Sequence, residues 1–218
     1  MALDVTTGIT IAVCADLIHL IYKTARPSYT VLGRRRTTSD RHYRNVTECD
    51  TVELVDKVLI FRFNGPLHFA NRDVFTASLW HELHLRQSGT QRSLPHEGSS
   101  QALTFAKWIT ATSAKSGTNR SELSAVVLDA SPMTHIDMSA CRSLEKLKRE
   151  LCALGIRLVI SHCNNDCLCK LEGMEFFKPS DDSSEPNVMC FGDLHDAVLC
   201  AEGRLFRASS SPSPLAQQ

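Results

Sequence analysis

The stretch that decides the fold is residues 125–163, AVVLDASPMTHIDMSACRSLEKLKRELCALGIRLVISHC. Its first part, Ala125–Leu128, is a short apolar, β-branched run that ends at Asp129, which is typical of a strand buried on both faces. A second apolar run, Ile156–Ile160, lies near its end. Between the two runs, apolar residues recur at spacings of four, three, four and three and share one helical face: Ala140, Leu144, Leu147, Leu151 and Leu154. The pattern predicts a βαβ unit, in which a right-handed crossover helix joins two parallel strands.

Capping residues flank this predicted helix on both sides. Asp137 and Ser139 offer side-chain oxygens to the free N–H groups of a starting helix. Gly155 can adopt the left-handed backbone conformation that closes a helix.

Four segments in register resemble one known family. Residues 127–139, VLDASPMTHIDMS, resemble the central signature of STAS domains: a strand ending in Asp, a short loop, an apolar residue followed by Asp, and a helix start. Residues 58–71, VLIFRFNGPLHFAN, look like a strand pair and turn of the SulP (sulfate permease) branch. Residues 26–33, RPSYTVLG, look like that branch's link between its last membrane helix and its STAS domain, and residues 191–198, FGDLHDAV, resemble the domain's last strand and helix.

The resemblance implies a fold and a domain layout. The expected fold class is α/β, with a STAS-like (SpoIIAA-like) mixed sheet of about five or six strands and helices mainly on one side. Residues 1–28 are expected to hold the end of a transmembrane helix and a basic linker, and residues 29–203 the STAS domain. Residues 88–122 correspond to a variable insertion loop. The Ser/Pro-rich composition of residues 204–218 predicts a disordered tail.

The bulk composition narrows the class of protein. Lysine plus arginine equals aspartate plus glutamate at 24 each, so net charge gives no indication of nucleic-acid binding. The nine cysteines are scattered and odd in number, which favours a reduced, cytosolic setting over a disulfide scaffold.

A largely apolar stretch near the start, Gly8–Tyr22, is broken by Asp16 and His19 and is followed directly by basic residues. Its fifteen residues fall short of the ~20 that span a bilayer, but the basic residues after it match the positive-inside pattern. We interpret it as the cytoplasmic end of a membrane helix whose remaining membrane domain is missing from this chain. The alternative is a buried or amphipathic helix of a soluble protein.

The basic run Arg34, Arg35 and Arg36 is a candidate lipid-facing segment. Each basic residue close to an anionic membrane surface adds about 1 kcal/mol to binding. The alternative is a solvated basic loop.

The sequence contains none of the common catalytic or phosphate-binding motifs: no G-x-x-x-x-G-K-[ST], no G-x-G-x-x-G and no G-x-S-x-G. His162, Cys163, Cys167 and Cys169 loosely match zinc-ligand spacing, but a second ligand pair is missing. We therefore expect no enzyme activity, no catalytic residue, no cofactor and no metal.

Asp129, Asp137 and Ser139 are the candidate regulatory residues, since they follow predicted strands where open α/β folds place ligand sites. In soluble STAS regulators, a serine directly after the Asp of this loop is phosphorylated and switches partner binding. Here Met138 occupies that position and Ser139 comes one residue later. The alternative is that Asp137 and Ser139 only cap the helix.

The resemblance implies a cytoplasmic regulatory domain of a SulP-type sulfate or anion transporter, whose full-length form exchanges sulfate, chloride, bicarbonate or oxalate. Its expected roles are dimer contact, trafficking and partner docking, at the cytoplasmic side of a membrane, by expectation the plasma membrane. The expected partners are the parent membrane domain, a second copy, regulatory proteins at residues 88–122 and anionic lipid headgroups, but not nucleic acid. The alternatives are a free-standing soluble STAS protein acting as a phospho-regulated binding module and, third, a small α/β enzyme or nucleotide binder.

Overall fold

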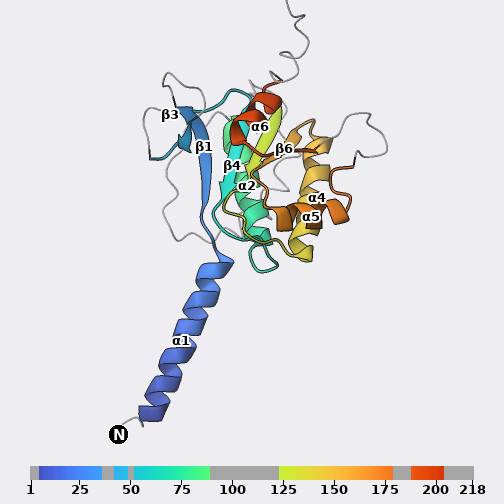
Figure 1. Cartoon of the computed structure of the whole chain (residues 1–218). Helices are drawn as coiled ribbons and strands as arrows, with labels where there is room; N and C mark the ends of the chain where they lie inside the picture. Colours follow the sequence, from blue (N-terminus) through green and yellow to red (C-terminus); the bar gives the residue numbers. More distant parts are fainter. Residues whose placement is uncertain (1–4, 36–41, 49–51, 89–122, 179–187, 204–218) are drawn as a thin grey trace, which may run out of the picture.

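The computed structural model describes residues 5–35, 42–48, 52–88, 123–178 and 188–203. A long helix, α1 (Val5–Ala25), projects away from an α/β body that the rest of the described chain forms (Figure 1). The variable insertion expected at 88–122, apart from Ser88 at the end of a helix, and the tail expected at 204–218 lie outside the described residues.

The body is built on one mixed sheet. Its strands are β1 (Tyr29–Arg35), β2 (Tyr43–Asn45), β3 (Val52–Glu53), β4 (Val58–Phe63), β5 (Ala125–Asp129), β6 (Arg157–Ser161) and β7 (Val188–Phe191). Six of them follow the order β2-β1-β4-β5-β6-β7, and β3 also pairs with β1. The strands from β4 to β7 are parallel, whereas β1 is antiparallel to β2, β3 and β4. The predicted α/β class and mixed sheet are confirmed, with two short strands, β2 and β3, accounting for the larger strand number.

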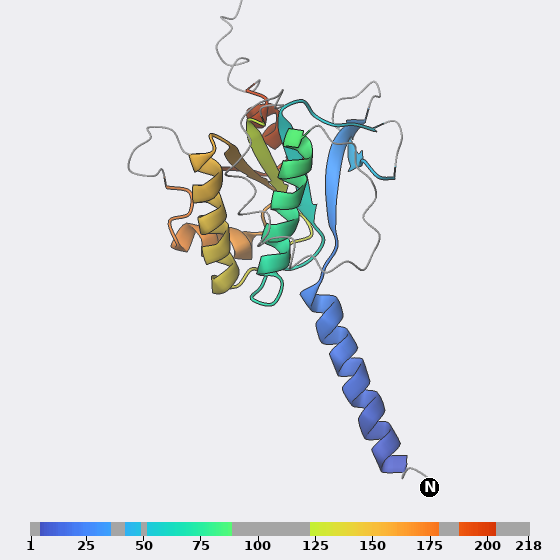
Figure 2. The ribbon, with the colours of Figure 1, turned by 180° about the vertical axis from the view of Figure 1, so that it is seen from behind.

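Helices cover the two faces of the sheet unequally. One face packs against α2 (Arg72–Ser88), α4 (Met138–Ala153) and α5 (Asn165–Gly173), and the other against α6 (Leu194–Ala201) (Figures 1 and 2). Strand β4 shows how the sequence divides between the two layers. Leu59, Phe61 and Phe63 join the larger core, while Val58 and Ile60 join the smaller one. This alternation follows from the two-residue period of a strand.

The predicted βαβ unit is present as β5, α4 and β6. All five residues of β5 are buried, and β5 pairs in parallel with both β4 and β6. Helix α4 ends at Ala153, and two residues later Gly155 has a φ of 72°, in the left-handed region. There the N–H of Gly155 donates to the carbonyl of Cys152, and the N–H of Ile156 donates to that of Leu151. These two bonds form a Schellman closure, which satisfies carbonyl groups at the end of the helix.

Two local features differ from what the sequence indicates. The short apolar run Tyr29–Leu32 after the linker is typical of an edge strand, but β1 lies between β4 on one side and β2 on the other. Leu67–Ala70 was expected to be a short partner strand, but the structure contains only a single bridge there, between Leu67 and Ile136. The segment instead forms a turn, because the backbone N–H and carbonyl groups of His68 form hydrogen bonds with Asn71.

Helix α1 is long enough to cross a membrane. Its 21 residues correspond to about 30 Å, close to the thickness of a bilayer's hydrocarbon core. Its mean hydropathy is 1.6, and none of its residues is buried against the body. The helix is longer than the apolar run Gly8–Tyr22 that the sequence singles out, because it continues over the residues on either side.

Gly33 in β1 provides a test of the sheet packing. A Cβ atom at this position would lie 2.5 Å from the carbonyl oxygen of Glu53 and 2.5 Å from Cγ1 of Val52, both in β3. We expect Gly33→Ala to lower the free energy of unfolding by about 1–3 kcal/mol, because β3 must move away. Urea unfolding followed by circular dichroism measures this change.

The matched control is Gly173→Ala at the end of α5, where an added Cβ meets nothing within 4 Å. This variant is expected to be neutral or more stable by up to about 1 kcal/mol. Equal stability of the Gly33→Ala variant and the unaltered chain would contradict the close β1–β3 packing.

Candidate regulatory site

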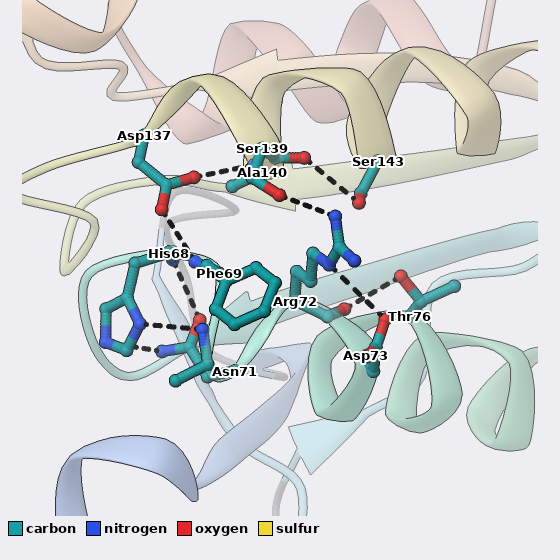
Figure 3. A network of polar contacts seen from close by, with 11 residues as sticks. His68, Phe69, Asn71, Arg72, Asp73, Thr76, Asp137, Ser139, Ala140 and Ser143 are labelled. Atoms are coloured by element: carbon teal, nitrogen blue, oxygen red, sulfur yellow. Dashed lines mark hydrogen bonds and ion pairs between the residues drawn. The ribbon is translucent and has the colours of Figure 1, made fainter. Parts of the chain in front are cut away.

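The carboxyl ends of the parallel strands meet at one edge of the sheet, and the three candidate regulatory residues, Asp129, Asp137 and Ser139, lie there. One group, which we call the Asp137 cluster, consists of Phe69, Arg72, Asp137 and Ser139 (Figure 3). It joins the turn before α2 to the first turn of α4.

Asp137 connects two segments that are far apart in the sequence. Its Oδ1 accepts a 2.7 Å hydrogen bond from the N–H of Ala140, so Asp137 is the N-cap of α4 as predicted. Its Oδ2 accepts a second 2.7 Å bond from the N–H of Phe69. Burial alone would raise the pKa of the Asp137 carboxyl, but these backbone bonds and the nearby His68 outweigh burial and hold the pKa below its ordinary value of 3.8.

Ser139 does not share in the cap through its hydroxyl. Its Oγ accepts a 2.5 Å hydrogen bond from Nη1 of Arg72, while its backbone carbonyl accepts a 3.2 Å bond from the hydroxyl of Ser143 (Figure 3). The guanidinium carbon of Arg72 lies 5.1 Å from the centre of the Phe69 ring. The serine hydroxyl therefore points at a cation from the neighbouring helix.

The turn that carries Phe69 is fixed from within. Asn71 is fully buried, accepts a 2.9 Å bond from the N–H of His68, and donates a 2.8 Å bond to the carbonyl of Pro66. The sequence predicts that Asn71 caps α2, but its side chain bonds back to the turn instead. The turn is thereby held in the shape that presents the Phe69 N–H to Asp137.

Two large apolar side chains at this site are exposed, one within the Asp137 cluster and one next to Asp137 in the sequence. Phe69 is 67% exposed and Met138 is 58% exposed. An exposed aromatic ring next to an arginine has the composition of a protein-binding surface.

Asp129 belongs to a separate network. Its carboxylate is fully buried and accepts bonds from Nε and Nη2 of Arg62 at 2.7 and 2.6 Å. The N–H of Ser131 also donates to it at 3.0 Å, and Nδ1 of His162 lies 3.4 Å from its other oxygen. These contacts tie β4, β5 and the end of β6 together. Asp129 therefore stabilises the sheet and does not complete the Asp137 cluster.

Sequence reasoning did not single out Arg62, Phe69 or Arg72 as members of these networks. For Arg62 a signal existed, because parallel pairing of two predicted strands places it opposite Asp129. Phe69 and Arg72 gave no such signal, since they meet Asp137 and Ser139 only through the tertiary packing of α2 beside α4.

The basic run has two described members. Nη2 of Arg34 forms a 3.0 Å ion pair with Glu202 after α6, and Arg35 is exposed at the end of β1. Arg36 lies outside the described residues. Contact of this run with lipid headgroups stays a prediction.

Among the described residues, no group of three or more His, Cys, Asp or Glu side chains is placed to hold a metal ion. Two of the residues that loosely match zinc-ligand spacing differ in their exposure to solvent. Cys167 is buried, with its thiol directed at the carbonyl of Met133, whereas Cys169 is exposed.

Comparison with known proteins gives the family. A model of the STAS domain matches residues 51–185, which is more than half of the chain. The chain belongs to the STAS domain family. This result confirms the predicted resemblance and agrees with the observed sheet.

Similar STAS-containing sequences occur among sulfate transporters. Human sulfate anion transporter 1 is 28% identical over 216 residues, which cover 94% of this chain and 30% of that protein. A sulfate transporter of Equus caballus is 23% identical over 198 residues, covering 89% of this chain and 26% of that protein. This STAS chain therefore spans about a third or less of the length of these curated relatives, and it is homologous to part of them.

Solved structures agree on the fold. The murine Slc26a9 anion transporter in the inward-facing state superposes with a TM-score of 0.61 at 18% identity, covering 92% of this chain and 26% of that one. A second structure, of SLC26A9, gives a TM-score of 0.64 at 19% identity.

The depressed pKa of Asp137 predicts how stability depends on pH. Because the folded-state pKa lies below the unfolded value near 3.8, the ionised carboxylate stabilises the fold above that pH, and this contribution is lost as pH falls through the folded-state pKa. We expect Asp137→Ala to lower the free energy of unfolding at pH 7 by about 1–2 kcal/mol. The difference from the unaltered chain is expected to shrink below pH 3.8.

The matched control is Asp73→Ala, which removes a carboxylate that is 89% exposed and lies 3.6 Å from Nε of Arg72. Its effect is expected to stay within about 0.5 kcal/mol at pH 7. Urea unfolding between pH 3 and 8 measures both variants. A constant Asp137→Ala difference down to pH 3 would refute the proposed role of the ionised carboxylate.

Proposed function

We propose that this chain is the cytoplasmic regulatory STAS portion of a SulP-type anion transporter, together with the end of its last membrane helix. The observation that carries the proposal is an exposed apolar helix joined directly to a STAS fold. Its large apolar side chains point into solvent on all sides: Val5, Ile9, Ile11, Val13, Leu17, Ile18, Leu20, Ile21 and Tyr22. This apolar surface, which Asp16 and His19 interrupt, requires a bilayer or other helices around it.

The charges at the end of α1 support a position of this helix end at the cytoplasmic surface of the membrane. Lys23 lies in its last turn, and Arg26 follows it and stacks over the ring of Tyr22 at 5.1 Å. Basic and aromatic residues at the end of an apolar helix are typical of the membrane interface on the cytoplasmic side. The STAS domain would then lie on the cytoplasmic side, and the plasma membrane is its proposed location.

The position of the Asp137 cluster relative to α1 supports a regulatory role. Strand β1 is antiparallel to β4, so its first residue, Tyr29, lies at the edge where β4 and β5 end. Both views place the turn before α2 at the same end of the body as α1 (Figures 1 and 2). A partner bound at Phe69 and Met138 would therefore lie next to the membrane helix, where it can influence the parent membrane domain.

The remaining roles follow as proposals from the same family relationship. The full-length protein would exchange sulfate, chloride, bicarbonate or oxalate through its membrane domain. The STAS portion would contribute dimer contacts, trafficking signals and docking of regulatory proteins, including at residues 88–122, and it would not act as an enzyme.

Carbonate extraction tests the transporter proposal directly. The protein is expressed with a C-terminal epitope tag in its source cells, and the cell membranes are washed with carbonate at high pH. The tagged protein in the pellet and in the supernatant is then sized on a denaturing gel. We expect a band far larger than 24.2 kDa that stays in the pellet. A band near 24.2 kDa in the supernatant would refute the proposal and favour a free-standing STAS protein.

A second candidate function, a phospho-regulated binding module, is favoured by one contact. Arg72 donates to the hydroxyl of Ser139, so a phosphate on that hydroxyl would meet a guanidinium group and the N-terminal end of α4. Both are favourable for a doubly charged anion. Phosphorylation would also add negative charge beside Phe69 and Met138 and would change which partner binds there.

Incorporation of phosphoserine at position 139 tests this candidate. We expect the modified chain to be more stable than the unmodified one by about 1 kcal/mol, because the phosphate pairs with Arg72. In an Arg72→Gln background the gain is expected to disappear. Thermal unfolding measures the four proteins, and a loss of stability on phosphorylation with Arg72 present would contradict the candidate.

A further inference from the structure

Two cysteines lie side by side where β6 and β7 end. Ser161 is opposite Phe191 in the parallel register, and the N–H of His162 continues the pairing with a 3.0 Å bond to the carbonyl of Phe191. The sulfur of Cys190 accepts hydrogen bonds from both the thiol and the backbone N–H of Cys163. The two thiols are therefore within hydrogen-bonding reach of each other.

An unusual backbone conformation precedes the pair. His162 has φ of 52°, in the left-handed region that non-glycine residues rarely adopt. Its ring is held by Asp129 at 3.4 Å and lies 3.9 Å from Asp193. Since the residue between β6 and Cys163 is anchored in this way, the position of Cys163 beside Cys190 is fixed by the fold.

The pair is accessible from solvent. Both cysteines line a cavity of about 570 Å³, whose other walls include Leu168, Phe177 and Val188. Cys190 itself is exposed. A small uncharged reagent can therefore reach both sulfurs through a largely apolar opening.

The hydrogen bonds from Cys163 also favour ionisation of the Cys190 sulfur. They lower the pKa of Cys190, whereas the same contact, followed by burial, raises the pKa of Cys163. Burial also raises the pKa of Cys141 and Cys167. Because the thiolate is the reactive form, Cys190 is the better nucleophile near neutral pH.

We propose that Cys163 and Cys190 form a dithiol site that reacts with hydroperoxides and closes reversibly to a disulfide. The Cys190 thiolate attacks a peroxide oxygen, so that an S–O bond forms, the O–O bond breaks and an alcohol or water leaves with a proton. Cys190 is oxidised by two electrons to a sulfenic acid, and the peroxide is reduced. The sulfur of Cys163 then attacks that of Cys190, an S–S bond forms, and the sulfenic oxygen leaves as water with the Cys163 proton.

The disulfide would change the domain without altering its core. It would connect the end of β7 to the segment after β6 and would enclose α5 in a covalent loop. A reducing thiol would reopen it, which suits the reduced compartment that the cysteine content predicts. The site would therefore make this face of the domain responsive to oxidant.

Peptide mass spectrometry on the full chain in detergent tests the proposal. The protein is treated with hydrogen peroxide, its remaining thiols are alkylated, and the peptides are compared with and without dithiothreitol. We expect a Cys163–Cys190 linkage that dithiothreitol removes, while Cys169, an exposed cysteine on α5, stays free to alkylate. In Cys163→Ser, dimedone is expected to trap the sulfenic acid on Cys190.

The alkylation rate of Cys190 provides a second measurement that does not depend on disulfide formation. At pH 7 we expect iodoacetamide to modify Cys190 several-fold faster than Cys169, because the hydrogen bonds from Cys163 lower the pKa of Cys190 and the thiolate is the reactive form. Equal rates, linkage of Cys190 to a cysteine other than Cys163, or faster oxidation of Cys169 would each overturn the proposal.

Discussion

The hydrogen bonds that join β4, β5 and β6 in parallel place the candidate regulatory residues at one edge of the sheet. Strand β5 is buried over its whole length, so its neighbours must pair with it on both sides or leave polar backbone groups without partners. Asp129 ends that strand, and its buried carboxylate is neutralised by Arg62 from the next strand. Removal of either the Arg62 or the Asp129 charge would leave the other without its partner, and this lowers the free energy of unfolding far more than the intact ion pair raises it.

Much of this arrangement follows from local sequence rules. The buried run Ala125–Leu128, the helical spacing of the leucines and the caps at Asp137 and Gly155 each report on a few neighbouring residues. The structure contains them, except that Leu154 lies after the last residue of α4 and is exposed because the helix has already ended. The alternation along Val58–Phe63 is equally local. Such signals require no knowledge of the tertiary fold, which is why the β4, β5, α4 and β6 elements could be predicted.

The rest depends on contacts between distant residues. Nothing near Ser139 in the sequence indicates that Arg72 donates to its hydroxyl, and nothing near Cys163 indicates that Cys190 lies beside it. The role of Asn71 was missed for a related reason: a helix-capping residue type was present, but its side chain satisfies the preceding turn. Which side chains from different helices and strands meet depends on how those elements pack. A single sequence therefore indicates which residues are able to pair but does not indicate which of them do.

The connection between α1 and β1 is only three residues long, from Arg26 to Ser28. Its backbone is also fixed to the body, since the carbonyl of Ser28 accepts a 2.9 Å bond from the N–H of Asn64. A fully extended three-residue link reaches about 10 Å, so the sheet edge cannot diffuse away from the end of the helix. Weak contacts between that edge and whatever surrounds the helix would act at an effective concentration of the order of millimolar, where even low affinities give substantial occupancy.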